Sequence, residues 1–155
     1  MATRVLFVCM GNICRSPTAE GVFRHLVAAQ GRSGQIITDS AGNHDYHVGA
    51  APDVRAQAAA ARRGYDLSDL RARQVTRGDF TTFDHVLAMD AANHRLLQQL
   101  CPAERRDRLR LVLEFATGTA LREVPDPYYG GAQGFEAVLD LVENAAHGLL
   151  RYIER

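Results

Sequence analysis

The chain has 155 residues, of which 46% are apolar and 23% charged, and its 18 basic side chains match its 18 acidic ones. A chain of this length buries roughly 70% of the surface that its unfolded form exposes, so we expect a single domain over residues 1–155. The balanced charge excludes a broad basic face for nucleic acid or for an anionic membrane, so any anion site must be local.

The absence of lysine and the pattern of cysteines exclude further classes of site. All the basic residues are arginines, which excludes a nucleotide P-loop with its GK[ST] signature and a Schiff-base lysine. The three cysteines contain no CxxC pair, which argues against a disulfide framework and a structural zinc site. No signal peptide or long apolar run is recognisable, so we expect a cytoplasmic protein and leave secretion without a signal peptide open.

The first predicted elements are a strand, a helix and a second strand. Residues 5–8 form an unbroken β-branched and aromatic run, typical of a strand buried on both faces. Ser16 is predicted to cap a helix that has Pro17 at its first position. A second strand is expected at residues 36–37, leading into the sequence Ser40-Ala41-Gly42.

The same alternation continues to the end of the chain. The expected elements are a helix that Pro52 opens and Gly64 ends, a strand at 86–89, a helix at 92–100, a strand at 109–113 and an amphipathic helix from about Gly134. Repeated strand–helix units predict an α/β fold with a parallel sheet covered by helices on both faces. Ligands bind beyond the carboxyl ends of such strands, where we place Cys9, Ser40 and Asp90.

The loop between the first strand and the first helix has the features of an anion site. It consists of Cys9, Met10, Gly11, Asn12, Ile13, Cys14 and Arg15. Gly11 permits a tight turn, and backbone N–H groups just before a helix N-terminus can point inward and bind an oxyanion. Arg15 adds a planar cation that grips two oxygens of a phosphate-like group. The loop is therefore predicted to bind a phosphoryl dianion without a metal.

Cys9 lies at the predicted base of this loop. The positive surroundings should keep its side chain a thiolate at neutral pH, and a thiolate that faces a bound phosphate is a nucleophile for phosphoryl transfer. The Ser16 hydroxyl could donate a hydrogen bond to the sulfur. The alternative for Cys9 is a small, inert core residue.

A departing phenolate or alkoxide needs a proton, which an aspartate near a strand end could supply. The candidates are Asp39, Asp90 and Asp126. Asp90 could instead cap the helix that follows it. Asp126 is favoured because prolines on both sides stiffen its loop, while Tyr128 and Tyr129 could form the wall of a groove for an aromatic leaving group. The alternative for the two tyrosines is ordinary half-buried packing.

Four motifs resemble one known family. The sequence "VLFVCMGNICRSPTAE" at 5–20 resembles the active-site loop of the low-molecular-weight protein tyrosine phosphatases, and "DPYYGG" at 126–131 resembles their acid loop. The sequences "DSAG" at 39–42 and "MD" at 89–90 occur in the same order and at compatible spacing. The resemblance spans essentially the whole chain.

The resemblance implies a flavodoxin-like, four-stranded parallel sheet and hydrolysis of phosphotyrosine and aryl phosphate monoesters through a phosphocysteine. It implies that Cys9 is the nucleophile, Arg15 the phosphate clamp and Asp126 the general acid and base. No metal or other cofactor is implied. The implied partner is a phosphotyrosine-containing protein, with a tyrosine kinase as one candidate, and we expect a monomer or a weak dimer.

The resemblance also implies supporting residues. Asn12 and Ser40 resemble positions that hold the loop in a strained shape by hydrogen bonding, although each could be a plain turn residue. Tyr46 stands where many relatives carry an aromatic residue, often Trp, at the rim of the cleft. Met10 and His44 are expected to line the same rim.

This chain departs from the family pattern at one position of the supporting network. Many relatives carry a histidine joined to the serine and asparagine network where this chain has Leu70.

Cys14 could form a disulfide with Cys9 that protects it from overoxidation, or it could be a buried apolar residue. His44 and His47 have a spacing that metal ligands can have, but nothing completes such a site, so we predict a solvated loop without metal.

Two rival functions remain for comparison. A thioredoxin-coupled arsenate reductase shares this fold and thiol loop but needs two further relay cysteines, and only Cys101 is available. A noncatalytic phosphate-binding module or thiol redox sensor would need neither a nucleophile nor an acid. The presence of both Cys9 and Asp126 favours an enzyme.

Overall fold

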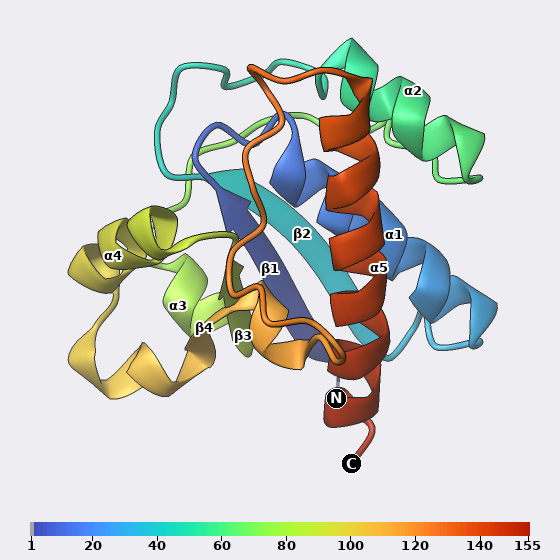
Figure 1. Cartoon of the computed structure of the whole chain (residues 1–155). Coiled ribbons are helices and arrows are strands. Elements are labelled where there is room, and N and C mark those ends of the chain that lie inside the picture. The colour runs from blue at the N-terminus through green and yellow to red at the C-terminus, as the bar shows by residue number, and fades with distance from the viewer. Residues whose placement is uncertain (1) are drawn as a thin grey trace.

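The computed structural model describes residues 2–155 as a four-stranded parallel sheet between helices (Figure 1). The strands are β1 (Thr3–Cys9), β2 (Ile36–Gly42), β3 (His85–Ala88) and β4 (Leu109–Leu111), in the order β2-β1-β3-β4. In doubly wound sheets of this kind, ligands bind beyond the carboxyl ends of the strands. The predicted α/β fold with a parallel sheet is confirmed.

Helices cover both faces of the sheet, also as predicted. They are α1 (Arg15–Ala29), α2 (Val54–Arg62), α3 (Asp79–Thr82), α4 (Ala91–Leu100) and α5 (Ala132–Ile153), with the 3-10 turns η1 (Ala103–Arg108) and η2 (Val112–Phe115). Figure 1 shows α1 and α5 on one side of the sheet and α3 and α4 on the other. Within residues 2–155, no helix has both the length and the hydropathy to cross a bilayer.

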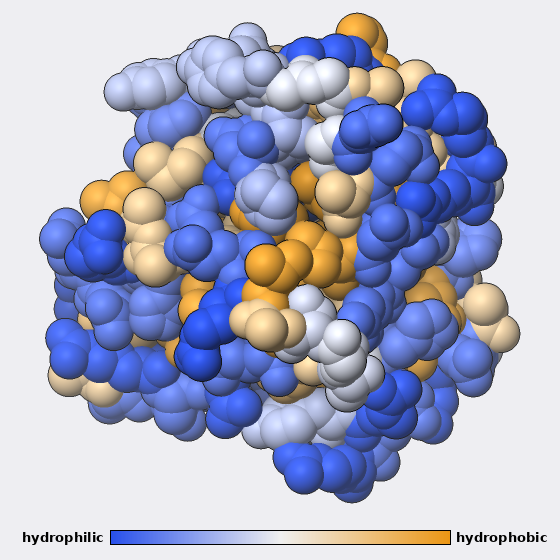
Figure 2. All heavy atoms as spheres, in the orientation of Figure 1, coloured by the Kyte–Doolittle hydropathy of each residue, from blue (hydrophilic) through white to orange (hydrophobic). Residues whose placement is uncertain are grey.

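The core consists of two hydrophobic clusters that the sheet separates. Because successive side chains of a strand point to opposite faces, Phe7 of β1 packs with the α1 and α5 residues while Leu6 and Val8 pack with Phe80 and Leu97. Each of these fully buried side chains contributes about 1.5–3 kcal/mol of hydrophobic stabilisation. Outside this core, the surface over α5 is largely hydrophilic, and hydrophobic atoms are exposed in a hollow beside it (Figure 2).

Two local predictions were wrong. Ser16 does not cap α1, because the helix begins at Arg15 with Cys14 at the N-cap, and the Ser16 hydroxyl turns to Cys9 instead. The fourth strand ends at Leu111 rather than at 113. The Glu114 carboxylate accepts the Leu111 N–H at 2.8 Å, which starts a 3-10 turn where the apolar run alone favoured a strand.

Candidate active site

The loop between β1 and α1 wraps around the sulfur of Cys9. The Cys9 residue is only 3% exposed. The Asn12 backbone N–H donates to Cys9 Sγ at 3.3 Å, and Ser16 Oγ lies 3.0 Å from the same sulfur. Both groups can donate a hydrogen bond to the sulfur.

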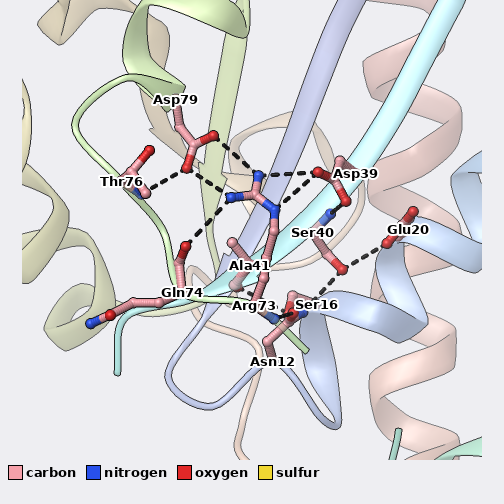
Figure 3. Close-up of polar contacts among 10 residues, drawn as sticks. All are labelled: Asn12, Ser16, Glu20, Asp39, Ser40, Ala41, Arg73, Gln74, Thr76 and Asp79. Carbon is pink, nitrogen blue, oxygen red and sulfur yellow. Dashed lines mark hydrogen bonds and ion pairs between the residues drawn. The ribbon is translucent and has the colours of Figure 1, made fainter. Parts of the chain in front are cut away.

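Asn12 holds the loop in its shape. Its φ of 59° lies in the left-handed region, where asparagine is tolerated better than most residues. Both polar atoms of its side chain form hydrogen bonds. Nδ2 donates to Ser16 Oγ at 2.8 Å and to Ser40 Oγ at 3.0 Å, and Oδ1 accepts the Arg73 N–H at 3.0 Å. The structure thus brings Asn12, Ser16 and Ser40 together in one buried network (Figure 3).

Arg15 lies at the end of the loop and is buried. Its Nη1 donates to Asp90 Oδ2 at 2.6 Å and to the Val124 carbonyl oxygen at 3.0 Å. Burial opposes the charge, but Cys9 and Asp90 together raise the pKa of Arg15 above its ordinary value, so the guanidinium stays charged. Asp90 also accepts the Asn93 N–H at 2.7 Å, so it caps α4, the alternative role considered for it, and holds the guanidinium in addition.

A cavity of about 380 Å³ opens above the loop. It is lined by Cys9, Met10, Gly11, Ile13, Cys14, Arg15, His44, Tyr46, His47, Asp126, Tyr128 and Tyr129. The cleft residues named from the sequence therefore surround one opening. Asn12, Ser16 and Ser40 do not line it, because they lie behind the loop in the network that supports it.

Asp126 is the candidate acid that faces the cavity. Its Oδ2 lies 3.9 Å from Arg15 Nη2, and its Oδ1 accepts the Tyr128 N–H at 3.0 Å. The other two aspartates are engaged elsewhere, since Asp90 pairs with Arg15 and Asp39 pairs with Arg73 at 3.0 Å. Of the three candidates considered, only Asp126 lines the cavity.

The rim of the cavity is aromatic and exposed. Tyr46 is 79% exposed and Tyr129 is 92% exposed. The ring of His44 stacks on that of Tyr46, with centroids 3.9 Å apart. A flat wall of this kind suits the ring of an aryl phosphate.

His47 lies in a solvated loop, as the sequence predicted, but nothing in the sequence placed it at the cleft. It lines the cavity, and a Cβ on Gly11 would lie 3.0 Å from His47 Cδ2 and 3.1 Å from His44 Cε1. Glycine at position 11 thus leaves room for two imidazoles against the loop. Within residues 2–155, no group of three or more His, Cys, Asp or Glu side chains is placed to hold a metal ion.

The second thiol of the loop, Cys14, also lines the cavity. Burial, followed by the charge of Asp53, raises the pKa of Cys14 to about 12, so this thiol is protonated at neutral pH. Cys9 and Cys14 are both free thiols in the structure. Cys101 lies in the hydrophobic cluster on the α3 and α4 side and does not line the cavity, so it gives no support to an arsenate reductase relay.

The comparisons with known proteins agree with this geometry. Residues 4–155 match the family model described as "Low molecular weight phosphotyrosine protein phosphatase". The chain is 46% identical to a low molecular weight protein-tyrosine-phosphatase of Streptomyces coelicolor over 153 residues, which cover 97% of this chain and 93% of the relative. It is 40% identical to the phosphatase YfkJ of Bacillus subtilis over 151 residues, or 97% of this chain and 96% of that one.

A solved structure extends the likeness to three dimensions. A protein tyrosine phosphatase from Entamoeba histolytica, crystallised with Hepes in its active site, matches with a TM-score of 0.96 at 39% identity. The match covers 99% of this chain and 97% of that chain.

Proposed function

We propose a residue-level mechanism from the premise that this chain belongs to the low molecular weight phosphotyrosine protein phosphatase family and is a protein tyrosine phosphatase. One observation carries the mechanism: the thiol of Cys9, the guanidinium of Arg15 and the carboxyl of Asp126 all line one cavity. In this proposal the whole chain, residues 1–155, acts as a single phosphatase domain.

The first step is transfer of the phosphoryl group to sulfur. The Cys9 thiolate attacks phosphorus in line, so that an S–P bond forms as the bond from phosphorus to the leaving oxygen breaks. Asp126 gives its proton to that oxygen. Arg15 and the loop N–H groups hold the other phosphoryl oxygens as charge redistributes, which lowers the energy of the transition state.

The second step is hydrolysis of phosphocysteine. Asp126, now a carboxylate, takes a proton from water, which attacks phosphorus and releases inorganic phosphate and the Cys9 thiolate. The Ser16 hydroxyl, 3.0 Å from the sulfur, stabilises the thiolate as it leaves. Each step uses only side chains of this chain and water.

The rim supports an aryl phosphate as substrate, and the family supports a phosphotyrosine-containing protein, of which a tyrosine kinase is one candidate. Three free thiols are consistent with a reducing compartment, so we place the enzyme in the cytoplasm as a monomer or weak dimer. Cys14, which lines the same cavity as Cys9, is the proposed disulfide partner that protects the nucleophile from overoxidation.

Hydrolysis of p-nitrophenyl phosphate tests the mechanism. We expect Cys9→Ser to abolish turnover, while Cys101→Ser, which alters a thiol outside the cavity, retains it. Asp126→Asn should slow turnover mainly for esters with poor leaving groups and should still allow Cys9 to be phosphorylated. Full activity in Cys9→Ser, or equal rates for Asp126→Asn and wild type across a leaving-group series, would contradict the assignment.

The physiological substrate can be sought with a trapping variant. Asp126→Ala should retain the phosphate loop but transfer the phosphoryl group to Cys9 slowly, and should therefore hold phosphorylated proteins from a cell lysate. Recovery of tyrosine-phosphorylated proteins that vanadate elutes is the expected result. Their absence, with p-nitrophenyl phosphate hydrolysis intact in the wild type, would favour a small phosphoester as substrate.

A further inference from the structure

A buried carboxyl group lies behind the phosphate loop. Glu20 of α1 is 6% exposed, and its Oε1 lies 2.7 Å from Ser40 Oγ on β2. It takes part in none of the ion pairs that residues 2–155 form. Glutamates are rarely buried without a charged partner, so the position of Glu20 calls for a cause.

The network that Glu20 joins has one fixed end at Arg73. The Arg73 guanidinium lies between two carboxylates, with Nη2 3.0 Å from Asp39 Oδ2 and Nη1 3.1 Å from Asp79 Oδ2 (Figure 3). These contacts hold the Arg73 backbone N–H against Asn12 Oδ1. An N–H can only donate, so the Asn12 amide cannot flip without setting two donors against each other.

The direction of the remaining hydrogen bonds follows from that end. With Oδ1 accepting from Arg73, Asn12 Nδ2 must donate to both Ser16 Oγ and Ser40 Oγ. Ser40 then accepts from Asn12, and its own proton is directed to the Glu20 oxygen. Ser16 likewise accepts from Asn12.

The last hydrogen bond to assign is the one that the Ser16 hydroxyl donates. The Cys9 sulfur lies 3.0 Å from Ser16 Oγ, whereas the other available acceptor, the Ala41 carbonyl oxygen, lies 3.4 Å away. The sulfur is the closer acceptor and, in the thiolate that the proposed mechanism uses, also the stronger one. One consistent set of donors and acceptors thus joins Glu20 at one end to Cys9 at the other.

We propose that Glu20 is a positioning residue of the phosphatase reaction. By accepting the Ser40 proton, it keeps Ser40 an acceptor for Asn12, and this bond helps to keep Asn12 in its left-handed conformation with the Ser16 proton directed to the sulfur. Leu70, where the resemblance led us to expect an imidazole, offers no polar group, so Glu20 forms the polar end of the network in this chain. The inference rests on the proposed role of Cys9.

Two substitutions of Glu20, each by a side chain of similar size, distinguish the loss of its hydrogen-bond acceptor from a change in packing. Glu20→Met fills the space but cannot accept, whereas Glu20→Gln retains a carbonyl oxygen that can. We expect Glu20→Met to lower kcat for p-nitrophenyl phosphate about tenfold, the usual effect of losing a buried hydrogen bond, and to move the alkylation of Cys9 by iodoacetate to higher pH. Glu20→Gln should stay within about threefold of wild type in kcat.

Two further variants serve as partner and control. Ser40→Ala should reproduce the loss of Glu20→Met, and the double variant should lose no more than either single one, because both interrupt the same hydrogen bond. Asp69→Asn removes a nearby exposed carboxylate that pairs with Arg24 and does not touch the network. It should leave both kcat and the pH profile of alkylation unchanged.

The outcomes separate positioning from packing. A folded Glu20→Met protein with wild-type kcat and an unchanged alkylation profile overturns the inference, even if its Tm falls. Should Glu20→Met not fold, Ser40→Ala decides, since an unimpaired kcat overturns the inference and an impaired one beside a near-normal Glu20→Gln supports it. An inactive wild type or an active Cys9→Ser would instead refute the mechanism itself.

Discussion

The phosphate loop and the acid loop face each other across one cavity, yet they are held in different ways. Arg15 and Asn12 are each 2% exposed and have partners on β2, at the N-cap of α4 and in the segment at Arg73. In the acid loop the Asp126 side chain is 47% exposed and Tyr129 is 92% exposed. The nucleophilic half is thus fixed before substrate arrives, whereas the acid half can adjust to it.

This contrast predicts two kinds of defect. A change behind the phosphate loop should impair every substrate, because attack on phosphorus is common to all of them. A change at the acid loop should lower kcat/KM most for esters whose leaving oxygen needs a proton, although the hydrolysis of phosphocysteine, which also uses Asp126, is common to all substrates.

The largest effect is expected at Gly42, where β2 meets the loop. A Cβ there would lie 2.9 Å from the Met10 carbonyl oxygen and 3.1 Å from the Asn12 backbone nitrogen, and neither backbone atom can move without shifting the loop. Because a displacement of about 1 Å can cost 100-fold in rate, we expect Gly42→Ala to lower kcat/KM about 100-fold for good and poor leaving groups alike. Steady-state kinetics on two aryl phosphates measures this.

The control for that variant is Gly34→Ala, where a Cβ meets nothing within 4 Å. It should change kcat/KM by less than about twofold, as surface substitutions usually do. If Gly42→Ala kept kcat/KM near that of wild type while remaining folded, the loop would be more adaptable than its contacts indicate.

A smaller effect is expected at Asp90, which holds the phosphate clamp. Asparagine there can still cap α4 but loses the charge that pairs with Arg15 at 2.6 Å. A hydrogen bond between charged groups contributes about 1.5–3 kcal/mol, so Asp90→Asn should lower kcat/KM roughly 10- to 100-fold and weaken competitive inhibition by phosphate. Glu123→Gln, at the same helix N-terminus but without contact to Arg15, is the matched control. An unchanged inhibition constant for phosphate would disprove this role.

Arg55 should have a weaker and more selective effect, because it holds the acid loop. Its Nη2 donates to the Tyr128 carbonyl oxygen at 3.0 Å, and its guanidinium lies over the rings of Tyr128 and Phe135 while pairing with Asp53 at 2.9 Å. We expect Arg55→Met to lower kcat about threefold to tenfold for phenyl phosphate and less for p-nitrophenyl phosphate. Arg62→Met is the control, and an equal loss on both esters would show that Arg55 does not act through the acid.

The sequence predicted the parts of the site that depend on local order. The thiol, the glycine and the arginine of the phosphate loop follow one another on a single strand–loop–helix unit, so their meeting needs no knowledge of the rest of the fold. Asp126 was favoured from its own proline-flanked loop, and the resemblance to a family strengthened that choice, since nothing local joins it to Cys9, more than a hundred residues away. What was missed is mostly pairing between different elements, as between Arg15 and Asp90, 75 residues apart, or between Ser40 and Glu20, 20 residues apart.

Another error arose because a serine hydroxyl can either cap a helix or bind a neighbouring side chain. A serine before a proline is a common helix cap, but here the Ser16 hydroxyl is taken by the Cys9 sulfur and the Asn12 amide, so the helix begins earlier. The expected edge, where Cys9, Ser40 and Asp90 all follow buried strands, was the signal that could have placed Asp90 beside the loop. His47 gave no comparable signal, since its approach to Gly11 depends on how the segment after β2 folds back.

The smallest expected effect concerns the two thiols of the phosphate loop, and it depends on pH. Burial and Asp53 raise the pKa of Cys14 from 9.0 to about 12, so above pH 9 the unfolded chain releases this proton while the folded chain keeps it. The free energy of unfolding should therefore be unaffected by Cys14 below pH 9 and should fall as the pH rises from there towards 12. We expect the Tm of Cys14→Ala to decline less than that of wild type between pH 8 and about pH 10, by a few degrees in thermal scans. Parallel declines in the two proteins would mean that Cys14 ionises as readily in the folded chain as in the unfolded one.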